Sequence, residues 1–485
     1  MTRMQTDPAF TSALELRAAM GRKEISPVEV VTAAIARMEA LEPVLNCFVT
    51  RTPDLALDAA RAAEAAILAG EDPGPLGGLP LSVKDLIAVG GVRLTFGSRT
   101  MAGNIAPADA PSVERVRAAG ACILGKTTTP EFGCKGTGDS PLTGITRNPW
   151  DPTKTPGGSS AGAASSVAAG VTPFALCTDG GGSARIPAAM CGLVGVKAQF
   201  GRVPVFPTSA MPTMAHVGVL ARTVRDAALL LSVVSGHDRR DPFSVAGPVP
   251  DYLDACDRSV EGMRVVWSPT LGYAEPLAEV VAVAEEAVRA LQGAGCRVDM
   301  MDHVMDEDPL DLWVSEFYAG ASTRLRRYLE EERELLDPAI AAVLDQALAQ
   351  PLQEYYTKVF KRYDFRETMR SFFENIDLLV TPTVPVPAFA VGLDVPPQLP
   401  QRNVVSWQYY TYPFNLTGQP AASVPAGFTA AGLPVGLQLV AKINHETDLF
   451  RAAAALESVG PWAGRRPPFG WAAPSGQPHP PQLPQ

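Results

Sequence analysis

The stretch TDGGGSARIPA at residues 178–188 decides how this 485-residue chain is interpreted. Three consecutive glycines, Gly180, Gly181 and Gly182, stand directly before Ser183. Glycines leave consecutive backbone N–H groups unshielded, and such groups can converge on a developing oxyanion. A phosphate-binding nest is the alternative, but the full phosphate-loop pattern, with lysine and then serine or threonine after the last glycine, is absent.

Two upstream segments carry polar groups that fit the same chemistry. GLPLSVKD at residues 78–85 closes an apolar strand with Lys84. Burial would disfavour the charged ammonium, lower its pKa and make it a base, although a lysine at a strand end can also reach solvent. TPGGSSAGAAS at residues 155–165 places Ser159 and Ser160 after paired glycines, which suits a sharp turn into a helix.

A second hypothesis competes for the nucleophile. Residues 158–162 fit the G-x-S-x-G elbow, which would make Ser160 the nucleophile of an α/β-hydrolase. The late His445 would then supply the histidine of a triad. That hypothesis leaves Lys84 and the glycine stretch before Ser183 without a role.

The three segments, in this order, resemble the amidase signature family. Lys84 and Ser159 are 75 residues apart, and Ser159 and Ser183 are 24 apart, as is typical of that family. The resemblance extends over about residues 10–460. Other similar stretches are TRNPW at 146–150, ARTV at 221–224, LVTPT at 379–383, NLTGQPA at 415–421 and GLPVGLQLV at 432–440.

The resemblance implies Lys84 as base, Ser159 as proton shuttle on a cis peptide bond, and Ser183 as nucleophile. The oxyanion hole would fall on the backbone N–H groups of Gly180–Gly182 and Ser183. The implied reaction is hydrolysis of a carboxylic amide through an acyl-enzyme, with aryl amides, esters and carbamates as related substrates. It requires no metal and no organic cofactor.

Two departures from the family pattern and two rival functions accompany this interpretation. Gly180 replaces the threonine or isoleucine of many members, and Ala161 replaces a usual glycine.

The first rival is the glutamine-hydrolysing A subunit of a tRNA-dependent amidotransferase. Members of that group look similar in carrying glutamine at the position of Ile186. The apolar Ile186 disfavours a pocket that is specific for glutamine as substrate. The second rival is a non-catalytic scaffold, which retention of all three catalytic residues disfavours.

The rest of the chain predicts one α/β domain over residues 1–465. The resemblance implies a large twisted mixed sheet with helices on both sides, and a catalytic core at about 74–235 and 376–460. Residues 300–375 form a helical insertion on the substrate side, and the proline-rich residues 466–485 a disordered tail. Ser26 and Glu29 form the capping box of an early helix.

One helical face near the start of that insertion has two interpretations. Leu310, Trp313, Val314 and Phe317 follow one another at helical spacing. Core packing is the simpler explanation. The sharper hypothesis is that Trp313 and Phe317 roof the substrate pocket, with Ile186 as its floor.

Composition limits the other function classes. The net charge is −10 without a run of lysine or arginine, which disfavours nucleic-acid binding. The seven cysteines form no CxxC pair, which disfavours a disulfide framework and a thiolate zinc site. No signal-like or 18-residue apolar segment is present, so we expect a cytoplasmic protein without a membrane span. A homodimer is compatible with the sequence, which does not specify the oligomeric state.

Overall fold

Four strands from the region of alternating strands and helices expected around residues 74–201 belong to one large sheet. The structure, a computed structural model, describes residues 7–399 and 403–469. The strands of this sheet are β1 (Phe48–Arg51), β2 (Pro80–Lys84), β3 (Cys122–Thr127), β6 (Phe174–Asp179), β7 (Val194–Lys197), β8 (His216–Ala221), β9 (Arg264–Trp267), β10 (Arg297–Met300), β11 (Leu378–Pro382), β12 (Ala421–Phe428) and β13 (Pro434–Ala441).

The order of these strands is β1-β3-β2-β6-β8-β7-β12-β13-β11-β9-β10. The sheet contains parallel pairs, such as β2 with β6, and antiparallel pairs, such as β6 with β8, so it is mixed as expected. The remaining strands, β4 (Asp139–Ser140) and β5 (Gly144–Ile145), form a separate two-stranded ribbon. The predicted α/β fold with one large mixed sheet is confirmed.

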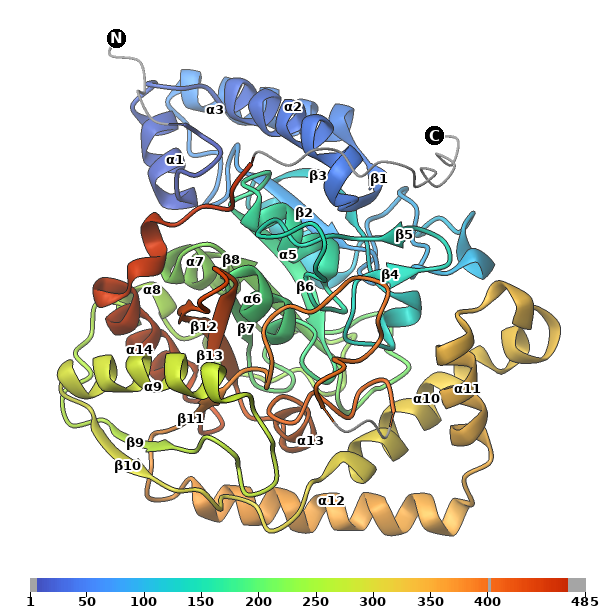
Figure 1. The fold of residues 1–485 in the computed structure, drawn as a ribbon. Coiled ribbons are helices and arrows are strands. Elements are labelled where there is room, and N and C mark those ends of the chain that lie inside the picture. Colours follow the sequence, from blue (N-terminus) through green and yellow to red (C-terminus); the bar gives the residue numbers. More distant parts are fainter. Residues whose placement is uncertain (1–6, 400–402, 470–485) are drawn as a thin grey trace.

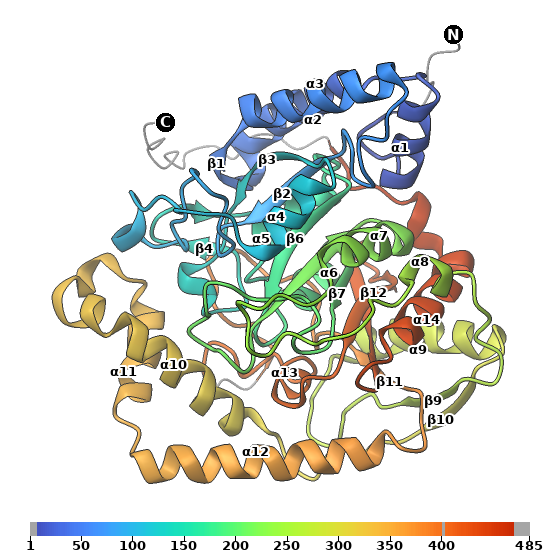
Figure 2. The ribbon, with the colours of Figure 1, turned by 180° about the vertical axis from the view of Figure 1, so that it is seen from behind.

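Helices cover both faces of the sheet (Figures 1 and 2). One face is packed by α5 (Ala161–Ala168) and α6 (Arg185–Cys191). The opposite face is covered by α1 (Ala13–Gly21), α4 (Pro111–Ala118), α7 (Val224–Val234), α8 (Tyr252–Ala255), α9 (Ala278–Gly293) and α14 (Glu446–Val459). At the β1 end lie α2 (Pro27–Leu45) and α3 (Pro53–Ala69).

The start of α2 shows how the local sequence sets an element. Ser26 Oγ accepts the backbone N–H of Glu29 at 3.1 Å, and the Glu29 carboxylate accepts the N–H of Ser26 at 2.9 Å. These reciprocal bonds satisfy two donors that a helix start would otherwise leave unpaired. The capping box is therefore confirmed.

The helical insertion forms an arm beside the sheet. It consists of α10 (Leu310–Glu331), α11 (Pro338–Leu348) and α12 (Leu352–Phe372), and α13 (Pro413–Thr417) packs against it. Figure 1 shows α12 crossing the foot of the molecule. Among the described residues, no helix is both long and apolar enough to cross a membrane. Of the predicted tail, residues 470–485 lie outside the described residues.

Candidate active site

Lys84 ends β2 in the interior of the protein. Every residue of β2 is buried, and the lysine side chain itself is fully enclosed. Its Nζ donates to Ser159 Oγ at 2.7 Å, Ser160 Oγ at 3.0 Å and Thr178 Oγ1 at 2.8 Å. An ammonium group has three donors, so three hydroxyl groups satisfy it completely. A neutral amine has a lone pair and can instead accept a proton from one of them.

The surroundings of Lys84 favour the neutral amine. Burial lowers the pKa of its ammonium group to about 7, because removal from water penalises the charged form. The negative charge of the nearby Asp179 raises this pKa, but by less than burial lowers it. The Asp179 carboxylate already pairs with Arg185 at 2.9 Å. A substantial fraction of Lys84 is therefore available as a base near neutral pH.

Ser159 and Ser160 lie in the turn that leads into α5. The Gly158–Ser159 peptide bond is cis, as the family resemblance implied. Ser160 has no exposed surface and donates its hydroxyl hydrogen to the Thr178 carbonyl at 3.2 Å. A nucleophile must reach substrate, so the complete burial of Ser160 disfavours the elbow hypothesis. Ser160 instead supports Lys84.

Ser183 lies between β6 and α6, after the three glycines. It is half-buried, and its carbonyl accepts the Ser160 N–H at 3.3 Å, which places the two serine segments side by side. Within the described residues its hydroxyl makes no hydrogen bond to another side chain. Ser183 is thus the more accessible serine of the cluster, as a nucleophile must be.

A buried ion pair holds the glycine loop. Asp179 accepts the N–H groups of Gly182 at 2.8 Å and Ala184 at 3.2 Å. Arg185 donates to both oxygens of the same carboxylate, at 2.9 and 3.0 Å. Although burial alone would raise the pKa of Asp179, the Arg185 guanidinium holds that pKa well below its usual range. The carboxylate is therefore a permanent acceptor for the loop.

The other donors of Arg185 reach distant segments. They bond to the Thr411 carbonyl at 2.9 Å, Gln438 Oε1 at 2.7 Å and Asn415 Oδ1 at 2.7 Å. Thr411 also donates its hydroxyl hydrogen to the Gly181 carbonyl at 2.6 Å. The loop before Ser183 is consequently tied to β13 and to residues 411–415, which keeps its amide groups in one orientation.

Trp313 and Phe317 of α10 pack against this loop from behind. Trp313 Nε1 donates to the Gly180 carbonyl at 2.8 Å. A Cβ on Gly181 would lie 2.4 Å from the Trp313 ring, and a Cβ on Gly180 would lie 2.9 Å from Phe317. A side chain at either position would therefore require these rings to move.

The three predicted pocket residues are all buried. Trp313 is 2%, Phe317 5% and Ile186 0% exposed. A Cβ on Gly182 would come within 2.8 Å of Ile186, so this side chain also supports the loop. Their contact with substrate stays a prediction, and in this structure they contact the glycine loop.

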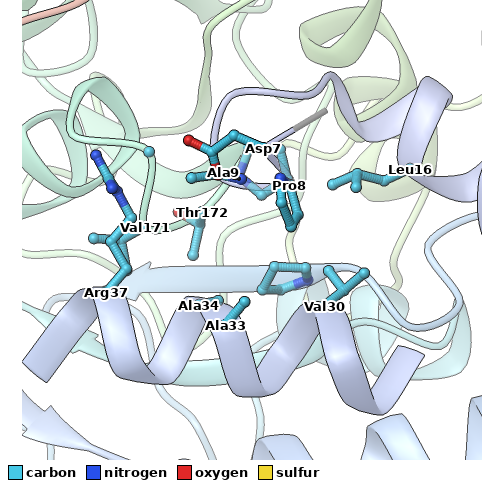
Figure 3. A pocket seen from close by; sticks show the side chains of 13 residues that line it. Asp7, Pro8, Ala9, Leu16, Val30, Ala33, Ala34, Arg37, Val171 and Thr172 are labelled. Atoms are coloured by element: carbon cyan, nitrogen blue, oxygen red, sulfur yellow. Dashed lines mark hydrogen bonds between the residues drawn. The ribbon is translucent and has the colours of Figure 1, made fainter. Parts of the chain in front are cut away.

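A small cavity lies in another part of the molecule. The cavity has a volume of about 120 Å³. It lies between the first described residues, α2 and the turn at 170–173 (Figure 3). Arg37 and Thr172 line it, but Lys84, Ser159 and Ser183 do not. It is distinct from the catalytic cluster. Among the described residues, no group of three His, Cys, Asp or Glu side chains is arranged to hold a metal ion.

Comparison with known proteins agrees with this combination of fold and residues. The family model described as Amidase matches residues 29–450, and the chain belongs to that family. It is accordingly an amidohydrolase that acts on C–N bonds.

Its relatives include two different functions. An acylamidase of Rhodococcus erythropolis is 36% identical over 94% of this chain and 97% of the relative. A glutamyl-tRNA(Gln) amidotransferase subunit of Moorella thermoacetica is 37% identical over 95% of this chain and 99% of the relative. A solved bacterial aryl acylamidase superposes with a TM-score of 0.87 at 30% identity, covering 95% of this chain and all of the other.

The groups that hold the candidate catalytic residues in place were not predicted from the sequence. Thr178 and Asp179 end β6 immediately before the glycines, and Arg185 follows them, so polar residues flanking a glycine run were a usable signal. The role of Ser160 as a partner of Lys84 had no such signal, because the same motif also fitted a nucleophile.

Proposed function

We propose that the chain is an acyl-amide hydrolase in which Lys84, Ser159 and Ser183 form a proton relay. The observation that carries the proposal is the 2.7 Å hydrogen bond from the fully buried Lys84 to Ser159, beside the half-exposed Ser183. The full-length similarity to an acylamidase supports it. No other buried amine in the described residues bonds to a serine hydroxyl next to a glycine loop.

In this mechanism neutral Lys84 withdraws the Ser159 proton while Ser159 withdraws the proton of Ser183. The Ser183 oxygen then attacks the amide carbonyl. Ser159 passes a proton to the departing nitrogen, because an amide anion is too basic to leave unaided. Water reaches the acyl-enzyme and is activated by the same relay, which restores Ser183.

The oxyanion is stabilised by backbone N–H groups of the glycine loop. Because Asp179 engages the Gly182 N–H, the groups of Gly180, Gly181 and Ser183 are the better candidates. The buried network around Arg185 orients them before substrate binds, so little reorganisation is needed during the reaction.

The alternative function is that of a glutamine-hydrolysing amidotransferase component. It is favoured by the amidotransferase subunit named above, which is as similar to this chain over its full length as the acylamidase is. The buried, apolar Ile186 favours the acyl-amide hydrolase. A substrate glutamine bound beside it would need hydrogen-bond partners for its polar side chain, and isoleucine provides none.

A hydrolysis screen on the isolated chain separates these functions. The panel contains short and long acyl amides, aryl amides, esters, urethanes and glutamine. Turnover of acyl or aryl amides without any added protein supports the proposal. The alternative would be established if glutamine were the one substrate of the panel that is hydrolysed, with release of ammonia, and if this happened only after partner proteins were added.

Ser159→Ala is expected to impair amides far more than activated esters. An amide nitrogen needs the donated proton, whereas a nitrophenolate leaves without one. The amide-to-ester ratio of kcat should fall by about two orders of magnitude or more. An equal loss on both substrates would contradict the shuttle role of Ser159.

Two variants of Trp313 separate its possible roles. Trp313→Phe keeps a ring against the glycine loop but loses the bond to the Gly180 carbonyl. If Trp313 positions the oxyanion loop, kcat should fall by up to about tenfold on every substrate with KM unchanged. If Trp313 roofs the pocket, Trp313→Ala should change the relative kcat/KM among substrates by about tenfold or more.

A further inference from the structure

Lys135 joins three separate segments of the chain through their carboxylates. Its Nζ donates to Asp139 Oδ2 at 2.7 Å, to Asp337 Oδ2 at 2.8 Å and to Asp394 Oδ1 at 2.8 Å. Asp139 begins β4, Asp337 directly precedes α11 of the arm, and Asp394 lies in the segment 389–399. Three acceptors satisfy all three N–H donors of the ammonium group. We call these four residues the Lys135 cluster.

The cluster keeps its lysine charged although the lysine is buried. Lys135 is 3% exposed. Burial alone would lower the pKa of Lys135, but the carboxylates of Asp139 and Asp337 raise that pKa well above its usual range. Lys84 is equally buried but bonds to hydroxyl groups, and its pKa falls to about 7. Lys84 can therefore act as a base, whereas Lys135 is a permanent cation that holds its partners.

The loop that carries Lys135 packs along the turn that carries Ser159. A Cβ on Gly133 would lie 3.2 Å from Ser159 Oγ. A Cβ on Gly158 would collide with the Thr137 carbonyl. The residues two positions before and two positions after Lys135 thus contact the two neighbouring residues of the turn. Because the interior is closely packed, a shift of this loop would displace the Ser159 side chain.

The arm holds this loop at three positions, Glu131, Cys134 and Lys135. Glu131 Oε2 accepts the backbone N–H of Asp337 at 2.7 Å. Tyr318 of α10 donates its hydroxyl hydrogen to the Cys134 carbonyl at 2.8 Å. The ion pair of Lys135 with Asp337 is the third attachment, and it is the one with charge on both sides. Such charge-assisted bonds are stronger than bonds between neutral groups.

The partner Asp394 comes from a segment that also flanks the Ser159 turn. The Phe389 carbonyl of that segment accepts the backbone N–H of Thr155 at 2.8 Å. Thr155 lies four residues before Ser159. Lys135 consequently connects two segments that both support the same turn, and it connects both of them to the arm.

We propose that Lys135 is a positioning residue that holds Ser159 within reach of Lys84, a role that presupposes the proton relay proposed above. Ser159 Oγ lies 2.7 Å from Lys84 Nζ. A displacement of about 1 Å at a relay atom can slow the reaction about a hundredfold. The alternative is that the cluster only stabilises the attachment of the arm.

The ratio of turnover on amides and on activated esters separates these two roles. Lys135→Met should lower the amide-to-ester ratio of kcat by about tenfold, because a displaced Ser159 protonates the departing nitrogen poorly and a nitrophenolate needs no proton. Arg202→Met is the matched control. It also breaks a buried ion pair, with Glu446 at 3.0 Å on the opposite face of the sheet. The control should lower the melting temperature and leave the ratio unchanged.

A milder variant covers the case in which Lys135→Met does not fold, since loss of the amine leaves three carboxylates close together. Asp337→Asn keeps the size of the side chain and the cap of α11, but it removes one charge from the cluster. The amide-to-ester ratio should again fall, although less than in Lys135→Met. Circular dichroism and thermal unfolding show whether each variant is folded.

A double variant shows whether Lys135 acts through Ser159. If it does, Lys135→Met should lower the ratio no further in a Ser159→Ala background. A further loss in that background would overturn the proposal, and so would an unchanged ratio in folded Asp337→Asn and Lys135→Met. If Ser159→Ala itself leaves the ratio unchanged, the relay and the role of Lys135 are both refuted. If only Ser159→Ala lowers it, the relay stands and the role of Lys135 is refuted.

Discussion

Ser183→Ala is expected to reduce turnover to the uncatalysed background, a loss of about four to six orders of magnitude. The variant keeps the glycine loop and the buried ion pair of Asp179 with Arg185, so its fold and thermal stability should be unchanged. Without the Ser183 oxygen no acyl-enzyme can form. Mass spectrometry after rapid quenching should detect acylated wild-type protein and no acylated variant.

Ser160→Ala is the matched control for that experiment. Ser160 is fully buried and bonds to Lys84 at 3.0 Å, so its loss should slow the reaction moderately without preventing acylation. A serine-directed fluorophosphonate should label the wild type and Ser160→Ala, but not Ser183→Ala. Labelling of Ser183→Ala together with an inert Ser160→Ala would show that the nucleophile is assigned wrongly.

The three candidate catalytic segments could be proposed from the sequence because each is short and local. Lys84 closes an apolar strand, and Ser159 and Ser183 follow glycines in tight turns, so residue type and spacing carry the signal. The capping box of Ser26 and Glu29 was predictable for the same reason, since its two bonds span three residues.

The groups that orient the site were not predictable in this way. Arg185 bonds to Thr411, Asn415 and Gln438, which are 226 to 253 residues away in the chain. Nothing local in a sequence indicates which distant acceptor a buried guanidinium will find. Likewise, β12 and β13 at the centre of the sheet stand out in the sequence only as family-like stretches, because strands buried on both faces lack the alternation that marks a half-exposed strand.

Trp313 shows where periodicity stops being informative. Its helical spacing with Leu310 and Phe317 predicted an apolar face, and that face exists. The sequence pattern does not indicate which part of the molecule this face packs against. The structure shows that it contacts the loop before Ser183, at glycines where an added Cβ would meet the Trp313 and Phe317 rings.

Lys84→Met is expected to lower kcat by about two to four orders of magnitude, the usual contribution of a general base. It should also remove the rising limb of the pH profile. The pKa of Lys84 is lowered to about 7 by burial, so the side chain is charged and inactive below that pH and neutral and active above it. Wild-type kcat/KM should therefore rise with pH through a midpoint near this value, and the variant should show no such rise.

Lys84→Arg is the control that separates charge from basicity. Arginine keeps the positive charge but cannot lose its proton in this pH range, so it should be as inactive as methionine. A variant with arginine that retained the wild-type pH profile would exclude Lys84 as the base.

Stability gives a second test of Lys84 that does not depend on substrate. Its pKa is lower in the folded chain than the usual 10.5 of an unfolded lysine, so the unfolded state binds more protons between about 7 and 10.5. The buried ammonium therefore destabilises the fold most below the folded pKa, and this penalty disappears as the pH rises towards the unfolded value. Relative to wild type, Lys84→Met should gain unfolding free energy at low pH and lose that advantage across this window. Denaturant unfolding at a series of pH values measures the difference, and a pH-independent difference would contradict the lowered pKa on which the proposed relay depends.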